Sequence, residues 1–319
     1  MISAERREFY ERLGRQKTAP LWEALARLIP AEPRPTAVPA MWRYGDIREL
    51  LMEAGRLITA REAERRVLML ENPGLPGKSL IAESLYAGLQ LVMPGEVTSQ
   101  HRHTSNAMRF IVEGTGAYTT VEGRRVTMHP GDFILTPSWT RHDHGNPSEE
   151  PVVWLDGLDV PIVNLFDTSF MDHHEDGEAA EGDARVFSYP YAASREALNR
   201  MAQQGAPHAC HGFKLAYADS AANAYPMLTI EAFLQLLPAG FRGAAYRATG
   251  ASVYCVAEGQ GHSRIGGETF QWTPGDVFVA PSWHPVSHET EGEAVLFSFS
   301  DRPAQKALGI WREEAPVGA

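Results

Sequence analysis

The sequence has few cysteines, no long apolar run and no cluster of basic residues. Only Cys210 and Cys255 occur in 319 residues, which is too few for a disulfide framework and is typical of a reducing compartment. No apolar stretch approaches the ~18 residues that a membrane helix needs, and the charged N-terminus does not fit a secretory signal. We therefore expect a soluble, cytoplasmic protein.

The charge balance also excludes some classes of partner. The net charge is −11, and acidic residues gather at 172–183. Without a Lys/Arg-rich run, neither nucleic acid nor an anionic membrane is expected as a partner. We interpret residues 172–183 as a solvated loop and expect its histidine pair, His173 and His174, to face solvent.

What the sequence does contain is a pattern of roughly 50 residues that occurs twice. The shared elements are a Glu-Gly-x-Gly turn, a Gly-Asp pair and a Pro-Ser-Trp turn, at 113–116, 131–132 and 137–139 in the first copy and at 258–261, 275–276 and 281–283 in the second. Aligning the turns gives three pairs of positions, His101 with Tyr246, His103 with Ala248, and His142 with Val286. A repeat that keeps its frame but has these histidines only once predicts a duplicated fold with one working site.

Hydrophobic periodicity predicts how the chain is organised. Apolar residues at helical spacing predict an N-terminal helical segment at 1–70. Its last helix opens at a capping box, Thr59 to Glu62, and is expected to run through Arg65 and Leu68.

Beyond residue 70 the pattern changes to short strands separated by turns. Strand patterns predict one β-domain at 71–165 and a second at 226–302. A connector, 166–225, joins them and contains a helix from Ser194 to Gln204 that ends at Gly205. The tail, 303–319, is expected to form a helix from Ala304 to Glu314.

Three histidines of the first copy form a candidate metal site. Side chains two positions apart on a strand face the same side, so His101 and His103 project together. An isolated His-x-His is more often a pair of structural histidines. Here His142 follows a turn that would return another strand across the same barrel, and the duplicated frame favours the metal site.

The same residues match the motifs of the cupin family. The first copy fits Gly95-x5-His101-x-His103 and Gly131-x5-Pro137 followed by His142. The second copy has the frame without the histidines, so the chain resembles a bicupin. This resemblance implies a mainly β fold of two double-stranded β-helix barrels with an N-terminal helical segment and a metal-free second barrel.

A narrower resemblance is to the ring-cleaving dioxygenases that act on gentisate, salicylate or 1-hydroxy-2-naphthoate. It spans about residues 40–300 and rests most clearly on 109–114, 136–139, 142–146 and 154–161. The glutamate ligand that many cupins place after the His-x-His motif is absent here, where Asn106 and Ala107 stand. These dioxygenases are similar in using three histidines, so this departure supports the narrower match.

The resemblance implies one Fe(II) per chain on His101, His103 and His142. Three neutral ligands leave about three open positions, which suits O2 beside an aromatic acid that chelates through its carboxylate and an ortho hydroxyl. Both oxygen atoms would enter between the carboxyl- and hydroxyl-bearing ring carbons. The first expectation is gentisate, opened to maleylpyruvate. Salicylate, a substituted salicylate such as 5-nitrosalicylate, and 1-hydroxy-2-naphthoate are alternative substrates, and a non-enzymatic ligand-binding cupin is the alternative class.

The resemblance also implies roles for residues around the metal. Arg109, His144 and Arg65 are the expected catalytic residues. Arg109 would lie on the same strand face as His101 and His103 only if the strand between them is unbroken. The alternative for Arg109 and Arg65 is that each is an ordinary solvated arginine. His144 could replace His142 as ligand, but the spacing from Pro137 argues against it. The expected substrate-binding residues are Tyr86, Gly88, Gln90 and Asp156.

Three further expectations concern the assembly, a second histidine cluster and a recurring tryptophan. The helices at the ends of a bicupin need a covering surface, so we expect a homo-oligomer, a tetramer or dimer, with the N-terminal helices in contacts. The run His208-Ala-Cys210-His211 could bind zinc, but it has no fourth ligand nearby, and we interpret it as incidental. Trp139 recurs as Trp283 in the second copy, which favours a packing role.

Overall fold

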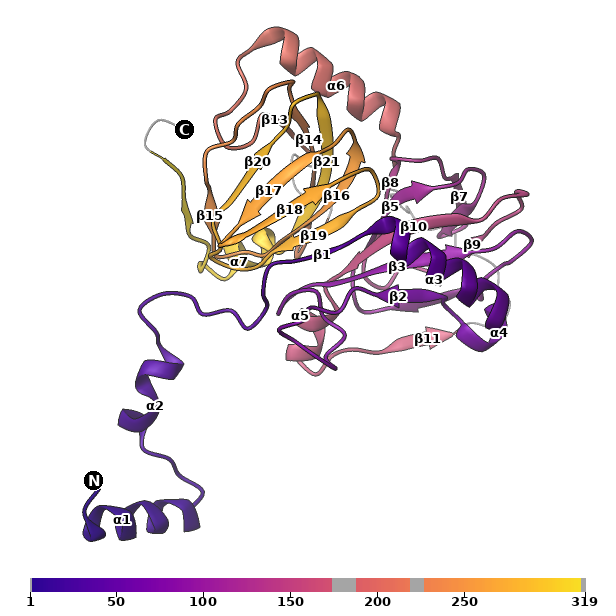
Figure 1. The fold of residues 1–319 in the computed structure, drawn as a ribbon. Coiled ribbons are helices and arrows are strands. Elements are labelled where there is room, and N and C mark those ends of the chain that lie inside the picture. The colour runs from indigo at the N-terminus through magenta and orange to yellow at the C-terminus, as the bar shows by residue number, and fades with distance from the viewer. Residues whose placement is uncertain (1, 174–187, 219–226, 317–319) are drawn as a thin grey trace. The chain divides into compact units, whose positions relative to one another are not determined.

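Figure 1 shows the computed structural model, which describes residues 2–173, 188–218 and 227–316. Its contacts divide the chain into two units, residues 1–34 and 35–319. The first unit contains helices α1 (Ala4–Arg15) and α2 (Leu21–Leu28). The apolar side chains of α2 are exposed, with Leu21 at 57% and Trp22 at 60%, so this helix has an uncovered apolar face.

The first repeat folds into two sheets of antiparallel strands. The six-stranded sheet has the order β12-β8-β5-β10-β3-β2, and the five-stranded sheet has the order β11-β4-β9-β6-β7. The strands are β2 (Val67–Met69), β3 (Tyr86–Val92), β4 (His101–His103), β5 (Ala107–Glu113), β6 (Tyr118–Val121), β7 (Arg124–Thr127), β8 (Phe133–Thr136), β9 (His142–Gly145), β10 (Val152–Leu158), β11 (Met171–His173) and β12 (Ser188–Tyr189).

The second repeat has the same construction. Its six-stranded sheet has the order β1-β19-β16-β21-β14-β13, and it is accompanied by a three-stranded sheet, β18-β17-β20, and a two-stranded sheet, β15-β22. The strands are β1 (Ala40–Trp42), β13 (Phe213–Ala216), β14 (Glu231–Leu237), β15 (Arg247–Ala248), β16 (Ser252–Glu258), β17 (Gly261–Ile265), β18 (Glu268–Trp272), β19 (Val277–Ala280), β20 (Val286–Glu289), β21 (Ala294–Ser300) and β22 (Glu313–Glu314).

The two barrels exchange strands. Strand β1 precedes the first barrel in the chain but pairs with β19 of the second, with Ala40 opposite Val279. Strand β12 precedes the second barrel but pairs with β8 of the first, with Tyr189 opposite Phe133. Each exchanged strand leads to a helix, α3 (Tyr44–Leu57) after β1 and α6 (Tyr191–Gln204) after β12. The exchange ties the two repeats into one structural unit.

The outward faces of the two six-stranded sheets contribute to one shared core. Phe110 of the first barrel stacks on Phe297 of the second with ring centroids 4.2 Å apart, and both belong to a single hydrophobic cluster. Alternation along a strand therefore gives each face a separate purpose. In β5, Phe110 belongs to this shared core, while its neighbour Arg109 lines the cavity of the first barrel.

Backbone hydrogen bonds confirm the alignment of the two repeats. His101 pairs with His142, and Tyr246 pairs with Val286. The amide of Trp139 donates to the carbonyl of His103 (2.8 Å), just as Trp283 donates to Ala248 (2.6 Å). Both tryptophans have positive φ, and each lies under an arginine, Arg102 or Arg247. Packing on the arginine explains why this residue recurs.

Two of the expected helices differ from the structure. The capping box at Thr59 and Glu62 is present, but its helix α4 (Ala60–Ala63) is a single turn, and Glu64 follows with a φ of 52°. The prediction of a helix through Arg65 and Leu68 is wrong, because β2 takes residues 67–69 into the sheet, where Leu68 pairs with Leu89. The last helix, α7, is also shorter than expected and covers only Arg302–Ala307.

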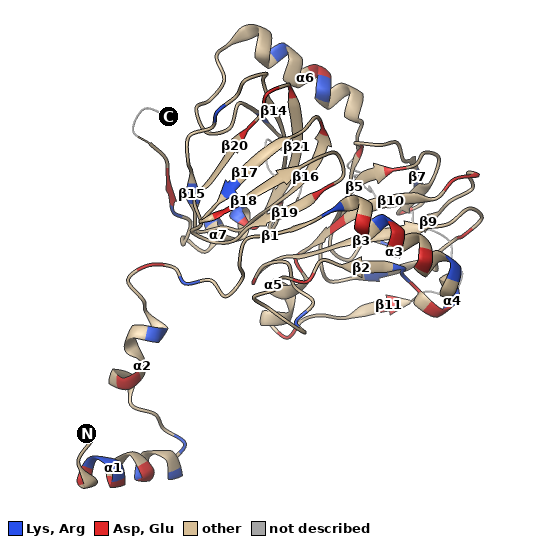
Figure 2. Ribbon diagram, in the orientation of Figure 1, with Lys and Arg blue, Asp and Glu red and all other residues tan. Residues whose placement is uncertain are grey.

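The helix expected at 194–204 is confirmed as part of α6, and Gly205 follows it. Helix α5 (Val160–Leu165) ends directly before the connector, which contains β11 and β12 of the first barrel and β13 of the second. Lys, Arg, Asp and Glu residues gather on helices such as α1 and α3 (Figure 2). None of the helices in the described ranges has the length and apolar character needed to cross a membrane.

Candidate active site

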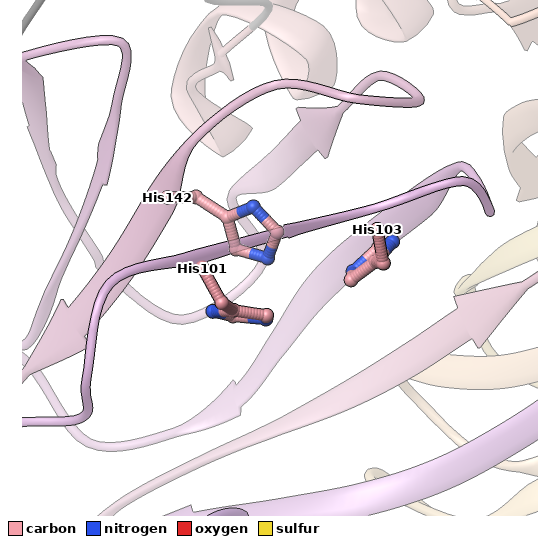
Figure 3. Close-up of side chains that lie close together, drawn as sticks. All are labelled: His101, His103 and His142. Carbon is pink, nitrogen blue, oxygen red and sulfur yellow. The ribbon is translucent and has the colours of Figure 1, made fainter. Parts of the chain in front are cut away.

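Three histidines meet inside the first barrel. His101 and His103 lie on β4 and His142 on the neighbouring strand β9, and their side chains converge (Figure 3). The ring centroids of His101 and His142 are 4.1 Å apart, and those of His103 and His142 are 4.9 Å apart. One nitrogen from each ring lies within 4.8 Å of the others, a spacing that can hold a metal ion.

The hydrogen bonds of these rings leave a nitrogen free for a metal. Nδ1 of His103 lies 2.8 Å from the carbonyl oxygen of Ser105, and Nδ1 of His142 lies 2.9 Å from that of Thr140. A carbonyl can only accept, so each Nδ1 carries the proton and each Nε2 keeps its lone pair. This is the tautomer that a metal ligand bound through Nε2 requires.

Burial keeps the imidazoles neutral. It lowers the pKa of His101 to about 3, with a further contribution from the nearby Arg65 guanidinium. Burial likewise lowers the pKa of His103, and it puts the pKa of His142 well below the usual value. Neutral imidazoles are the form that binds metals, so protonation does not compete with a metal near neutral pH.

The histidines open into a cavity of about 380 Å³, a volume typical of small-molecule sites. Its lining includes all the site residues expected from the sequence except Gly88. A Cβ at Gly88 would lie only 2.5 Å from Cγ1 of Val67 and 3.0 Å from the hydroxyl of Tyr86. Both of these neighbours do line the cavity, so Gly88 shapes the wall from behind it.

Arg109 and Asp156 form a buried charged pair on the sheet opposite the histidines. Arg109 Nε lies 3.7 Å from Asp156 Oδ1, too far for a hydrogen bond, and it has no hydrogen-bond partner in the described part of the chain. Asp156 Oδ1 accepts from Trp154 Nε1 at 2.9 Å. A buried donor without a partner costs about 1–3 kcal/mol, which suits a group kept for a ligand.

Burial shifts the pKa of both members of this pair. It raises the pKa of Asp156 to about 6, against the opposing effects of Arg109 and the Trp154 hydrogen bond. It lowers the pKa of Arg109 to about 10. The carboxylate is therefore mostly ionised near pH 7, and Arg109 is a cation.

Arg65 contacts a histidine of the metal-capable group directly. Its Nη2 lies 2.5 Å from Nδ1 and 3.0 Å from Nε2 of His101. A nitrogen lone pair that accepts from a guanidinium cannot bind a metal at the same time, so metal binding through that nitrogen requires Arg65 to turn away. The positive φ of Glu64, the preceding residue, shows that the backbone adopts an uncommon conformation here.

His144 is buried beside the three histidines but is not one of their group. Its ring centroid lies 5.7 Å from that of His142, and its Nδ1 lacks a hydrogen-bond partner among the described residues. Burial holds its pKa well below the usual value. The converging set is the one with His142, as the spacing from Pro137 indicates.

Arg109 reaches the cavity by a route that differs from the expected one. The strand is interrupted between His103 and Arg109, because the chain leaves β4, bends, and enters the other sheet as β5. Arg109 therefore faces the histidines across the barrel instead of lying beside them.

Several cavity residues were not expected from the sequence. Ala107 and Leu158 lie two positions from Arg109 and Asp156 on their strands, so strand alternation could have found them. Met171 and His173 line the cavity from β11, which pairs with β4 and sets His173 opposite His101. His173 is exposed, but it borders the cavity and is not simply a loop residue; His174 lies outside the described residues.

The equivalent positions of the second barrel have a different chemistry. Tyr246, at the position of His101, donates its hydroxyl hydrogen to Glu313 at 2.9 Å. Across the described ranges, the group of His101, His103 and His142 is the one identified as able to hold a metal. The rings of His208 and His211 stack on each other, with centroids 4.9 Å apart, and His211 contacts Tyr246.

Comparisons with known proteins agree with the fold and the site. Residues 88–159 match the Cupin domain family. The chain is 48% identical to gentisate 1,2 dioxygenase 1 of Aquipseudomonas alcaligenes over 98% of this chain and 97% of that protein. It is 34% identical to a 5-aminosalicylate 1,2-dioxygenase of Comamonas sp, over 96% and 89%. The crystal structure of a salicylate 1,2-dioxygenase of Pseudoaminobacter salicylatoxidans with gentisate matches with a TM-score of 0.92 at 32% identity, covering 100% and 96%.

These observations define the protein as a bicupin and a ring-cleaving dioxygenase. Within that class, the chain belongs to the family of gentisate, salicylate and 1-hydroxy-2-naphthoate 1,2-dioxygenases.

Proposed function

We propose that this protein is an Fe(II)-dependent gentisate 1,2-dioxygenase that opens gentisate to maleylpyruvate. The observation that carries the proposal is the cavity in which three neutral histidines face a buried Arg109–Asp156 pair. The 48% identity to a gentisate 1,2 dioxygenase over nearly the whole chain supports this substrate. Both atoms of O2 enter the product, so the reaction needs no external reductant.

His101, His103 and His142 would hold the iron. Their fit rests on the free Nε2 atoms of His103 and His142, and on a set of imidazoles without a carboxylate, which is a ligand type that suits iron. Bound Fe(II) would supply the place where the substrate oxygens and O2 meet and through which ring electrons reach O2. One such ion per chain is expected, in the first barrel.

The remaining residues bind and orient the aromatic acid. The guanidinium of Arg109 can donate to a carboxylate or to an oxygen at the reacting carbons, and it is already buried and has Nε free. Asp156 can accept a hydrogen bond from the 5-hydroxyl of the ring. Burial keeps the imidazole of His144 neutral, so it can accept a hydrogen bond from the ortho hydroxyl. Tyr86 and Gln90 form the wall and exclude water.

Oxygen uptake across a panel of acids tests the substrate assignment. The iron-loaded protein is given gentisate, salicylate, 5-nitrosalicylate and 1-hydroxy-2-naphthoate, and kcat/KM is compared. We expect gentisate to have the highest value and a product whose absorbance is that of a ring-opened keto diacid. A higher value for a ring without the 5-hydroxyl would transfer the assignment to that acid. No oxygen uptake with any of them would exclude the enzyme.

The assembly and the location of the protein stay predictions. The exposed apolar side chains of α2, such as Trp22, support the expectation of a tetramer or dimer. Light scattering at micromolar concentration should give at least twice the 35.2 kDa of one chain. A mass equal to one chain would contradict the expectation. A cytoplasmic location remains expected from the two cysteines.

A further inference from the structure

We propose that Lys78 captures the anionic substrate at the active-site cavity, an inference that rests on the proposed function and adds a residue to it. Lys78 is exposed, and it is one of the residues that line the cavity containing the three histidines. It is therefore accessible both to solvent and to the cavity. No motif or repeat position had marked it.

The loop that carries Lys78 is held in place from both ends. The buried amide of Asn72 donates to the carbonyls of Val38 and Ile81 and accepts from the amide of Gly74. The carboxylate of Glu71 accepts from the amide of Ser79 at 2.9 Å. Lys78 lies directly before Ser79, so its backbone position is fixed by these hydrogen bonds.

Within the described part of the chain, the ammonium group of Lys78 takes part in no ion pair. No carboxylate in the described ranges lies within 4.0 Å of it, and its side chain makes no hydrogen bond to another described residue. Glu71, the acidic residue of its own loop, directs its carboxylate to backbone amides at 77–79. Of the carboxylates that line the cavity, Asp156 is paired with Arg109 and Glu64 borders Arg65.

This free charge matters because the rest of the chain repels the substrate. The net charge is −11, and the proposed substrate is an aromatic carboxylate. A cation where the cavity opens reverses that repulsion locally and raises the rate of productive encounter. The effect depends on salt, because the Debye length shortens from about 30 Å at 0.01 M to about 8 Å at 0.15 M. A residue that acts by charge therefore has a distinct signature.

The test measures kcat and KM of the iron-loaded protein for gentisate between low and high NaCl concentration. Lys78→Gln should lower kcat/KM about 3- to 10-fold at low ionic strength, mostly through KM, and the difference from wild type should shrink as salt is added. Lys78→Arg should restore the wild-type value. Lys306→Gln removes the same charge from α7 at an exposed position away from the cavity lining and should leave kcat/KM unchanged.

Three results would overturn the inference. They are a defect of Lys78→Gln that is the same at every salt concentration, a defect in kcat alone, or an equal effect of Lys306→Gln. Wild-type turnover is measured in the same experiment. Failure of the proposed function would appear as no gentisate turnover by wild type, whereas failure of this inference leaves wild-type turnover intact and the variant without a salt-dependent defect.

Discussion

Replacing Asp156 by Asn should change which ring the enzyme prefers while leaving its fold intact. The residue is 6% exposed, and its Oδ1 accepts a hydrogen bond from Trp154. No hydrogen bond to its Oδ2 is recorded among the described residues, which leaves that oxygen available to a donor on the substrate. Asn keeps the shape, and its oxygen can keep the Trp154 hydrogen bond, but an amide NH2 group then takes the place of Oδ2 and the charge is lost.

The size of the effect follows from replacing a hydrogen bond to a charged carboxylate by one with a neutral amide. A hydrogen bond to a charged group contributes about 1.5–3 kcal/mol and a neutral one about 0.5–1.5 kcal/mol. The difference of roughly 1–2 kcal/mol corresponds to a loss of about 5- to 30-fold in kcat/KM for gentisate. Salicylate has no 5-hydroxyl to donate, so Asp156→Asn should leave its kcat/KM unchanged or raise it.

The Asp156→Asn variant should not lose activity through unfolding. A pKa of about 6 in place of 3.8 means that burying the ionised carboxylate costs on the order of 3 kcal/mol at neutral pH. Asn avoids that cost, although it also leaves the Arg109 cation with less compensation. We therefore expect a melting temperature close to or above that of wild type.

Oxygen uptake with both acids gives the ratio of kcat/KM values, and iron content is measured on the same samples. Asp46→Asn, the same chemical change at an exposed position on α3, is the matched control and should leave the ratio unchanged. If Asp156→Asn keeps full iron and the wild-type ratio, the carboxylate does not recognise the 5-hydroxyl, and the argument for gentisate from this residue fails.

The remaining predictions concern the metal, the pH profile and the residues beside the iron. Elemental analysis should find one iron per chain and none after His101→Ala with His103→Ala; two irons per chain would contradict the assignment to the first barrel. For gentisate, kcat/KM should fall as pH drops through about 6 or somewhat lower, because Asp156 loses its charge there and bound iron adds positive charge. The same residue should make the metal-free protein less stable as pH rises from about 4 to about 6, because the folded pKa of Asp156 exceeds its unfolded value. pH profiles of Asp156→Asn that are identical to those of wild type would refute both predictions. His144→Ala should lose roughly 10- to 100-fold in activity and keep its iron, while Arg109→Ala should lose more through the substrate carboxylate; loss of iron in His144→Ala would instead make that residue a ligand.

Local chemistry explains why so much of the site could be predicted. The His-x-His motif needs only strand alternation to place both rings on one face, and the Pro-Ser-Trp turn fixes where β9 returns. The repeat then identified which positions differ, because the backbone pairing of His101 with His142 has its counterpart in Tyr246 with Val286.

Non-local pairing explains most of what the sequence did not indicate. The capping box at Thr59 is a real local signal, but Val67 pairs with Gln90 in the sheet, and this pairing overrides the helical pattern. Nothing local marks Ala40 as the partner of Val279 in the other barrel. His173 is exposed as expected, but its place on β11 beside the cavity could not be predicted locally, because it depends on pairing with a strand about seventy residues earlier.

Strands β11 and β22 show how the same backbone arrangement supports a metal-capable barrel in one repeat and a different chemistry in the other. In the first barrel, β11 pairs with β4, and Asp172 binds Arg102 on the outer face. In the second, β22 pairs with β15, and Glu314 binds Arg247 in the same way. The difference lies on the other face.

On that face of the first barrel, Met171 of β11 lines the open cavity. In the second barrel, Glu313 of β22 lies opposite Ala248 of β15 and accepts a hydrogen bond from Tyr246. The residue of the first barrel that aligns with Tyr246 is His101, and the ring nitrogens are the only polar atoms of its side chain. At this position the second barrel therefore has a hydroxyl that holds β22 by a hydrogen bond, and the first barrel has an imidazole that can bind iron. The arginine–tryptophan stacks and the turns are common to both because they hold the frame, and catalysis depends on the few inward side chains that differ.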